Sequence, residues 1–355
     1  MIPVFRPYFG EEEKTLLSRV IDSQWVSEGA FTRQFEEELA KYLGVKYVVC
    51  VTSGGVALLL AIMSQRRKEH RFSVAMPVYQ HISLANSVTL LKDTPFFIDV
   101  YPMSGLLNMH SIKPGNLDLV KESLWTSVSM NGRYSSYRVD VEDDCQALAS
   151  TWNGKHLQAK VGCLSFHPTK ILTTGQGGAI FTDDQEAYEK VKALKDYGRF
   201  VDRTSGKEIP DYYNSWGMNF RFTEMQAAIG LAQLGRVEAR GKRVREIYDR
   251  YMDEIKIPHE ERTEQNGFVP WVCDIQFFKL GLNEELKSKL AERNIETRLP
   301  YRPLHQQPLY IGRTGDYSGA DWWSGTCLWL PSSPSLSDEE VDTVIKEMNK
   351  LGENL

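Results

Sequence analysis

The stretch YVVCVTSGGVALLLAIMSQ, residues 47–65, predicts a strand, a tight turn and a helix in immediate succession. YVVCV is apolar and β-branched, SGG supplies turn residues, and VALLLAIMSQ has the length and composition of a helix. The chain continues with a strand-like run at 72–76, a helical stretch over 82–91 and a second strand-like run at 95–99. Strands that alternate with helices in this way indicate a mostly parallel sheet covered by helices.

The pattern continues on both sides of this stretch. We expect further strands over 137–142, 161–166 and 179–182, and helices over 31–43 (ended by Gly44), 184–195 and 223–251. The last helix is long enough to be two, with Gly230 or Gly241 as the break.

The pattern changes from about residue 257. Strand-like runs at 271–278 and 327–330 alternate with helical stretches at 284–293 and 338–350, the last capped by Ser337. We therefore predict a large α/β domain over residues 1–240 and a small α+β domain over 241–355.

Composition excludes several classes of protein. The 355 residues are 42% hydrophobic and carry a net charge of -5, without the clustered basic face that nucleic-acid binding requires. The longest apolar run, 56–63, is far shorter than the roughly 20 residues of a membrane helix. The start, MIPVFRPYFG, lacks a signal-peptide pattern. We expect a cytoplasmic protein with neither a nucleic-acid nor a membrane partner.

The cysteines and histidines do not indicate a metal centre. Five cysteines are widely spaced without a CxxC pair, which favours buried, reduced thiols over zinc or disulfides. The histidines lack metal-ligand spacing, so we expect no metal site.

Three acids follow one another where a predicted strand ends, in VDVEDDCQALAS at 139–150. Open α/β sheets bind ligands at the carboxyl ends of their strands, so Glu142, Asp143 and Asp144 are candidates for a site. A solvated turn explains the same three residues equally well.

A lysine follows the next strand, in VGCLSFHPTKILTTGQGGAIFT at 161–182. The strand delivers Ser165, and Lys170 lies between apolar residues beside a turn. Burial lowers the pKa of an amine, and only the neutral amine attacks a carbonyl to form a Schiff base. For a lone lysine, an exposed loop position is the commoner interpretation. The GQGG of 175–178 is not a dinucleotide-binding motif, because strand-like AIFT follows where a helix is required.

Two further segments contain potential binding groups. Ser53, Gly54 and Gly55 join a strand to a helix, where free N–H groups and the helix dipole favour a phosphate, although a tight structural turn is equally compatible. In GMNFRFTEMQAAIGLAQL, residues 217–234, Asn219 and Arg221 precede a helix of small residues, which close helix packing alone can explain.

In this order and spacing, the motifs resemble the DegT family of sugar aminotransferases, which are fold-type-I pyridoxal phosphate enzymes. The resemblance runs from DSQWVSEGAF (22–31), through the segments above, to NIETRLPYRPLHQQPLY (294–310) and LWLPSSPSLSDEEV (328–341). Within the family it is similar to the perosamine-synthase-like members.

The resemblance implies a role for each matching residue. Lys170 would form the Schiff base with pyridoxal 5'-phosphate and move the proton during the reaction, and Asp143 would keep the pyridine nitrogen protonated. Gln146 would bond the ring hydroxyl. Ser165, with the turn Ser53–Gly55, would hold the phosphate.

The remaining implied roles concern the partner and the substrate. Asn219 would reach the phosphate in the neighbouring subunit, which implies a homodimer with shared active sites. The segments containing Trp25, Ser27, Tyr301 and His305 would approach the sugar nucleotide. For Trp25, packing of the N-terminal segment on the core is an equal alternative.

The sequence departs from the family at three places. Gly55 stands where a threonine is usual, so a hydroxyl is missing near the phosphate. In PVYQHIS, residues 77–83, His81 replaces the aromatic residue that stacks on the cofactor ring, and Gln80 a common threonine; a structural histidine is the alternative for His81. The stretch between Gly132 and Glu142 is short, which suggests a truncated helix.

The implied reaction is transfer of an amino group from L-glutamate to a keto group of a nucleotide-linked 4-keto-6-deoxy sugar. Relatives that dehydrate such sugars carry histidine at the Schiff-base position, whereas this chain has Lys170 there and His167 three residues earlier. Lysine favours amino transfer over dehydration. A non-catalytic relative is a third possibility, which the set Asp143, Gln146, Ser165 and Lys170 disfavours.

Overall fold

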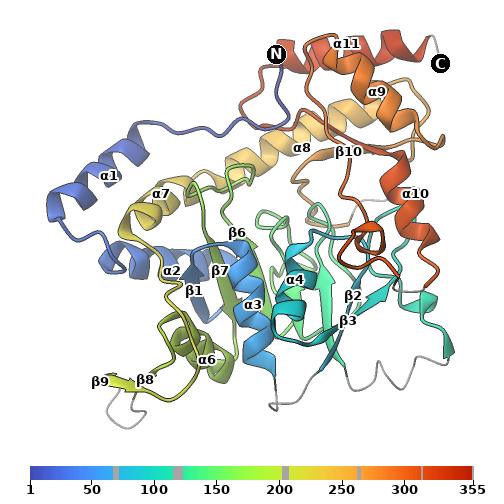
Figure 1. Ribbon diagram of the computed structural model, residues 1–355. Coiled ribbons are helices and arrows are strands. Elements are labelled where there is room, and N and C mark those ends of the chain that lie inside the picture. Colours follow the sequence, from blue (N-terminus) through green and yellow to red (C-terminus); the bar gives the residue numbers. More distant parts are fainter. Residues whose placement is uncertain (67–71, 115–122, 202–207, 262–264, 313–314, 354–355) are drawn as a thin grey trace.

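A computed structural model describes residues 1–66, 72–114, 123–201, 208–261, 265–312 and 315–353 (Figure 1). The helices are α1 (Glu11–Ser23), α2 (Ala30–Leu43), α3 (Gly54–Gln65), α4 (Ser83–Leu90), α6 (Gln185–Lys195), α7 (Glu224–Leu234), α8 (Val237–Glu254), α9 (Leu282–Ala291), α10 (Ser318–Thr326) and α11 (Asp338–Gly352), with short 3-10 turns at Met109–Ser111 and Leu304–Gln306. The strands are β1 (Tyr47–Val51), β2 (Ser73–Pro77), β3 (Thr94–Ile98), β4 (Leu124–Val128), β5 (Val141–Asp143), β6 (Val161–Ser165), β7 (Gly178–Thr182), β8 (Arg199–Val201), β9 (Glu208–Tyr213), β10 (Cys273–Gln276) and β11 (Cys327–Leu330).

A seven-stranded sheet forms the centre of the molecule, in the order β1-β7-β6-β5-β4-β2-β3. The pairs β2–β3, β2–β4, β4–β5 and β5–β6 are parallel, and β7 runs antiparallel to both of its neighbours. The predicted fold, a mostly parallel sheet flanked by helices, is confirmed.

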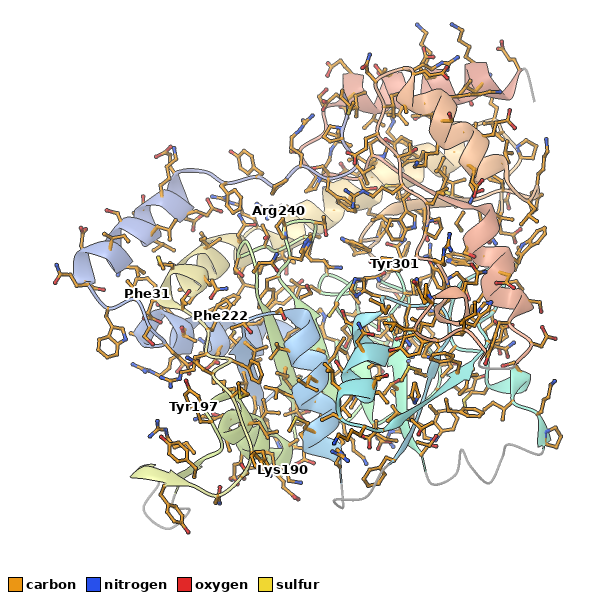
Figure 2. The ribbon with its side chains drawn as sticks, viewed as in Figure 1. Phe31, Lys190, Tyr197, Phe222, Arg240 and Tyr301 are labelled. Carbon is orange, nitrogen blue, oxygen red and sulfur yellow. The ribbon has the colours of Figure 1, made fainter. Side chains whose placement is uncertain are left out.

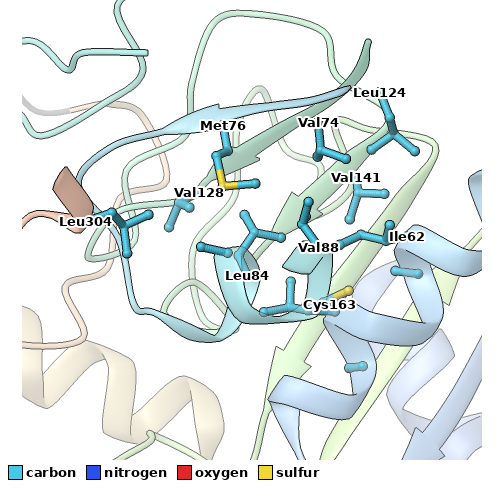
Figure 3. Close-up of a cluster of buried hydrophobic side chains, with 14 of the residues drawn as sticks. Ile62, Val74, Met76, Leu84, Val88, Leu124, Val128, Val141, Cys163 and Leu304 are labelled. Atoms are coloured by element: carbon cyan, nitrogen blue, oxygen red, sulfur yellow. The ribbon is translucent and has the colours of Figure 1, made fainter. Parts of the chain in front are cut away.

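Both faces of this sheet are buried, because successive side chains of a strand point to opposite faces. On β1, Val49 and Val51 belong to the cluster formed with α3, α4 and α6. Val48 and Cys50 point the other way and pack with α2 and α7. Figure 3 shows part of the first cluster, where strand and helix side chains meet. The two clusters fix the strand ends at one edge of the sheet.

A third cluster of apolar residues lies in the C-terminal part of the chain. It joins α8, α9 and α11 to the antiparallel pair β10–β11. The first residues of the chain also lie here, since Ile2 pairs with Ile295 in a parallel bridge and its N–H bonds the Asn294 carbonyl oxygen at 2.8 Å. Figure 1 shows the N-terminus beside the last helices. The proposed domains, 1–240 and 241–355, stay a prediction, and residue 240 falls within α8.

Some elements differ from the expectations. The long helix breaks at Gly235 and not at Gly230 or Gly241. Strand β5 spans only Val141–Asp143, whereas the sequence predicted a strand over 137–142. The sequence analysis missed α1, β4, the β8–β9 pair and α10.

The connection between the parallel strands β4 and β5 is short. Residues 129–140, all of them described, contain no helix, in line with the truncation that the sequence suggested. The connection is anchored on the C-terminal part instead: the Arg133 guanidinium bonds both carboxylate oxygens of Asp274 at 3.2 Å, and both side chains are buried. A buried ion pair thereby joins this connection to the C-terminal part of the chain.

None of the helices among the described residues combines the length and the apolar character that crossing a membrane requires. In the same described part of the chain, the His, Cys, Asp and Glu side chains form no group of three or more suited to a metal ion.

Candidate active site

The strand ends bring the predicted site residues together. Strands β1, β5 and β6 run in the same direction, so their carboxyl ends share one edge of the sheet. Ser53 follows β1, Asp143 ends β5 and Ser165 ends β6. This is the edge at which open α/β sheets bind ligands.

The start of α3 packs tightly against its neighbours. A Cβ atom at Gly54 would lie 2.7 Å from the Ser165 Cβ atom and 3.1 Å from its Oγ atom. A Cβ atom at Gly178 would lie 2.6 Å from the Gly54 backbone nitrogen. Both positions therefore require glycine. The Ser53 hydroxyl caps α3 by accepting from the Val56 N–H at 3.2 Å. The free N–H groups at the start of α3 thus lie next to the Ser165 hydroxyl, and together these donors suit an anion.

Lys170 lies in the turn after β6, half-buried, with its Nζ atom 3.6 Å from the centre of the Trp271 ring. Burial lowers the pKa of Lys170 to about 8, against the opposing influence of Cys145 and Asp143, which favour its charged form. Trp271 is held in turn, because its indole N–H donates to the Thr169 carbonyl oxygen at 2.8 Å. The lysine that the sequence singled out is therefore not an exposed loop residue.

The lowered pKa of Lys170 gives a pH prediction for the cofactor-free protein. At pH 7.5 about a quarter of the Lys170 amines are neutral, against about one in a thousand at the ordinary pKa of 10.5. The rate of combination with pyridoxal phosphate should rise about tenfold per pH unit below 8 and level off above it. Stopped-flow absorbance measures this rate. A rise that continues unchanged to pH 10 would contradict the lowered pKa.

The same pKa has a consequence for stability. The folded pKa of Lys170 lies below the ordinary value, so the unfolded chain binds more protons between about pH 8 and 10.5. The contribution of this group to stability therefore increases as the pH rises through that window.

The three acids at the end of β5 are all buried, so the solvated-turn interpretation is wrong. Burial raises the pKa of Glu142 to about 7 and that of Asp144 well above its ordinary value. The Ser129 hydroxyl oxygen lies within hydrogen-bonding distance of a carboxyl oxygen of each. Asp143 differs, because its charge acts on Lys170. Its Oδ1 accepts from the nearby Cys145 N–H at 3.1 Å, and its side chain also bonds the Cys145 thiol. Asp143 is thus the carboxylate available to the site.

Gln146 is fixed by the short β4–β5 connection. Its Oε1 atom accepts from the Asn131 N–H at 2.8 Å, so its amide NH2 group is the end that remains to donate. The Asn131 side chain also bonds both the N–H and the carbonyl of Val272, next to Trp271. Gln146 and Trp271 are thereby positioned through one asparagine.

His81 and Tyr301 meet near the end of β2. Their rings pack edge to face with centres 5.3 Å apart, and the Asp143 charge acts on both. The His81 Nδ1 atom lies 2.6 Å from the Ser83 hydroxyl oxygen. Tyr301 also packs against Trp329 of β11, so it comes from the C-terminal part of the chain. In Figure 2 it lies between that part and the sheet.

His305 lies next to this group but is engaged elsewhere. Its Nε2 atom is 3.0 Å from an Asp321 carboxylate oxygen of α10, and its ring packs on Tyr317. These contacts hold the His305 side chain against α10 and Tyr317.

Trp25, Ser27 and Asn219 are exposed and are not brought to Lys170 by their described contacts. Trp25 donates to the Glu28 carbonyl oxygen at 3.3 Å, and Asn219 accepts from the Arg221 N–H at 3.2 Å. Both segments flank the start of α7. Figure 2 shows Phe31, in the adjoining α2, on the opposite side of the view from Tyr301.

A buried carboxylate ties these two segments together. Glu224 accepts from the N–H groups of Gly29, Phe31 and Thr32 and from the Thr32 hydroxyl, at 2.8–2.9 Å. Its own N–H donates to the Val26 carbonyl oxygen at 3.2 Å. Glu224 therefore holds the segment of Trp25 and Ser27 against the start of α7.

Replacing Glu224 with alanine should lower the free energy of unfolding by about 3 kcal/mol, because three N–H groups and a hydroxyl lose a buried charged acceptor. Denaturant unfolding measures the change. Glu37→Ala, an exposed acid on α2, is the matched control and should change stability by less than about 0.5 kcal/mol. Equal losses in the two variants would contradict the role of Glu224.

Sequence reasoning missed three residues of the site. Trp271 contacts the Lys170 amine, and Cys145 lines the same small cavity as Gln146, Ser165 and Lys170. Arg298 carries a half-exposed guanidinium whose charge acts on Tyr301 and His167. A cysteine two residues from Asp143 could have been found from its motif, whereas Trp271 and Arg298 reach the site only through the fold.

Comparison with known proteins is consistent with this geometry. Residues 7–114 and 138–349 match the model of the DegT/DnrJ/EryC1/StrS aminotransferase family, whose enzymes depend on pyridoxal phosphate. GDP-perosamine synthase of Escherichia coli O157:H7 is 28% identical over 368 residues, covering 98% of each chain. Spore coat polysaccharide biosynthesis protein SpsC of Bacillus subtilis is 27% identical, covering 99% of this chain and 97% of that protein.

Among solved structures, the aminotransferase PseC of Helicobacter pylori, involved in pseudaminic acid biosynthesis, superposes with a TM-score of 0.87 at 22% identity, over the whole of both chains. This likeness concerns the fold. The family match covers most of the chain, including Ser53, Asp143, Ser165 and Lys170, and leaves out residues 115–137. The chain therefore belongs to the DegT/DnrJ/EryC1/StrS aminotransferase family.

Proposed function

We propose that this enzyme transfers an amino group from L-glutamate to the keto group of a nucleotide-linked 4-keto-6-deoxy sugar. The observation that carries the proposal is the Lys170 amine, whose pKa is lowered to about 8, placed where the Asp143 carboxylate acts on it. The relatives named for perosamine synthesis support a sugar substrate.

The residues present fit pyridoxal phosphate. The crowded start of α3, where Gly54 meets Ser165 and Gly178, leaves room for backbone approach but not for side chains. In our proposal Ser53, Gly54, Gly55 and Ser165 hold the phosphate. Asp143 pairs with the pyridine nitrogen, Gln146 donates its amide NH2 to the ring oxygen, and His81 lies against the ring face.

The bound cofactor supplies an electron sink and carries the amino group between the two substrates. The protein does the rest. Lys170 anchors the cofactor, and its neutral amine takes the proton from the reacting carbon and returns it. Asp143, held by the Cys145 N–H, keeps the pyridine nitrogen protonated through a charge-assisted bond in a site largely shielded from water.

Substrate recognition involves residues on two sides of the molecule. Tyr301 and His305 come from the C-terminal part, and Arg298 beside them offers a guanidinium suited to the carboxylate of the glutamate donor. Trp25 and Ser27 lie at the start of α7, away from Tyr301. One chain alone does not bring the two sets together.

A homodimer with shared active sites would join them, and we propose that Asn219 reaches the partner's phosphate. Large apolar side chains are exposed around Asn219, among them Trp216, which is 91% exposed, and Met218. An apolar surface of this kind is typical of a subunit interface.

Mixing two inactive variants tests the sharing. In a mixed dimer of Lys170→Ala and Asn219→Ala subunits, one site has both Lys170 and Asn219 intact if Asn219 acts across the interface. Activity should then recover toward half of the parent value in the mixed dimers. If each site is built from one chain, all sites in the mixture stay defective and activity does not recover.

Isotope transfer tests the reaction itself. We would incubate the enzyme with 15N-glutamate and a panel of nucleotide-linked keto sugars, and analyse the products by mass spectrometry. We expect a sugar product containing 15N together with 2-oxoglutarate. A product that has lost oxygen without gaining nitrogen would instead identify a dehydratase, and the absence of any 15N-labelled sugar across the panel would contradict the proposed substrate class.

A further inference from the structure

Gly55 differs from the other glycines of the site, because space does not require it. A Cβ atom at Gly55 would lie 3.8 Å from the hydroxyl oxygens of Ser53 and Ser83, an ordinary van der Waals distance. At Gly54 and Gly178 the nearest atoms would be at 2.7 and 2.5 Å. A glycine inside a helix is otherwise unfavourable. A Cβ atom would therefore fit at position 55, in van der Waals contact with Ser53 and Ser83.

Ser83 is the first residue of α4 and lies beside the start of α3. The Ser165 hydroxyl flanks Gly54 at 3.1 Å from the Cβ position, and the Ser83 hydroxyl flanks Gly55 at 3.8 Å. Two hydroxyl groups from different elements thus lie near two consecutive residues at the start of one helix.

We propose that the Ser83 hydroxyl is a ligand of the cofactor phosphate, in place of the threonine hydroxyl that this chain lacks at position 55. The inference rests on the phosphate placement in the proposed function. A hydroxyl group has one proton to donate and two lone pairs with which to accept. The His81 Nδ1 atom accepts from the Ser83 N–H at 3.3 Å, so in the cofactor-free chain it also accepts from the Ser83 hydroxyl, 2.6 Å away. When the cofactor binds, the hydroxyl would turn its proton to the phosphate, while the Ser83 N–H still holds the imidazole.

This arrangement links the two departures of the sequence from its family. Gly55 removes a hydroxyl from the phosphate end, and His81 replaces the usual aromatic residue at the ring face. Ser83 bonds His81 and lies next to Gly55. One serine thereby supplies the missing phosphate ligand and orients the imidazole that faces the ring.

The test compares pyridoxal phosphate with pyridoxal, which lacks the phosphate, by titrating each into the cofactor-free enzyme and following visible absorbance. Ser83→Ala should weaken binding of pyridoxal phosphate about tenfold, about 1.4 kcal/mol, and leave pyridoxal binding unchanged. The double variant Ser83→Ala with Gly55→Thr should recover most of that affinity, because the added threonine places a hydroxyl on the same side.

Two further variants separate the possible failures. Ser87→Ala removes a hydroxyl one turn further along α4, where it bonds the Ser83 carbonyl oxygen, and should leave both affinities unchanged. Ser165→Ala should weaken binding of pyridoxal phosphate. If Ser165→Ala and Ser83→Ala both leave it intact, the phosphate placement itself is wrong.

The inference alone is overturned by any of three results: Ser165→Ala weakens binding while Ser83→Ala does not, Ser83→Ala weakens both compounds equally, or Gly55→Thr restores nothing. Circular dichroism and thermal unfolding establish that each variant is folded before it is titrated.

Discussion

Replacing Lys170 with alanine is expected to remove the visible absorbance of the lysine-linked cofactor and to lower turnover by at least about 10³-fold. The amine has two tasks, attachment of the cofactor and proton transfer at the reacting carbon, and a positioned acid–base group alone contributes about 10²- to 10⁴-fold. Absorbance spectra and steady-state rates with glutamate measure both effects. If Lys170→Ala kept the visible band and full turnover, the assignment of this residue would be wrong.

A matched lysine lies at the other end of the same strand. Lys160 immediately precedes β6 and pairs with Asp140 at 2.8 Å in a partly exposed ion pair. Lys160→Ala should keep both the band and the activity, because surface ion pairs contribute little to stability. Both alanine variants should melt close to the parent protein, which separates loss of chemistry from loss of fold.

Replacing Asp143 with asparagine is the second large effect, a fall in kcat of roughly 10²- to 10⁴-fold with the cofactor still bound. Asparagine keeps the shape of the side chain but loses the charge that holds a proton on the pyridine nitrogen. Without that proton the ring is a poor electron sink. Rates at saturating cofactor measure the loss.

The neighbouring acid provides the control for Asp143. Burial raises the pKa of Asp144 well above its ordinary value, which favours its neutral form, and asparagine is a neutral side chain of the same shape. Asp144→Asn retains an oxygen that accepts from the Ser129 hydroxyl and should leave kcat within a few-fold of the parent. Equal losses in the two variants would mean that the strand end acts as a unit and that Asp143 has no separate role.

The strands that the sequence predicted well are those made mostly of apolar residues. Strands β1, β2, β3, β6 and β7 are short apolar runs bounded by turn residues. Strand β4 was missed because the buried positions Thr126 and Ser127 are polar. The Thr126 hydroxyl donates to the Ala75 carbonyl oxygen of the adjacent strand β2 at 3.0 Å. The hydrogen-bond partner of this buried polar side chain lies on the neighbouring strand, and no local sequence pattern reveals it.

The wrong helix break has a similar cause. A Cβ atom at Gly230 would lie 2.7 Å from the Phe35 ring of α2, so this glycine serves close helix packing. Gly241 likewise packs within α8, near Ala149 and Val269. The chain breaks at Gly235, where a Cβ atom would meet only the Ala232 carbonyl oxygen, at 3.9 Å. The sequence alone does not distinguish a glycine that allows close helix packing from a glycine that ends a helix.

Part of the site was predictable for a reason of topology. Asp143 and Ser165 end parallel strands, and such ends meet at one edge of a sheet. Ser83 and Trp271 enter the site from other elements without a motif of their own. Trp25 and Asn219 lie near the start of α7 in the single chain, and their roles stay predictions.

The short connection between β4 and β5 has a consequence for how the chain folds. Its anchors, Arg133 with Asp274 and Asn131 with Val272, each join residues 141 positions apart. Contacts of such long range are slow to form, because a large loop must close first. During synthesis, the stretch around Arg133 leaves the ribosome long before its partners. Gln146 accepts a hydrogen bond from the Asn131 N–H, so it reaches its final position only after the C-terminal half is made. The cofactor pocket is therefore among the last parts of the nascent chain to form.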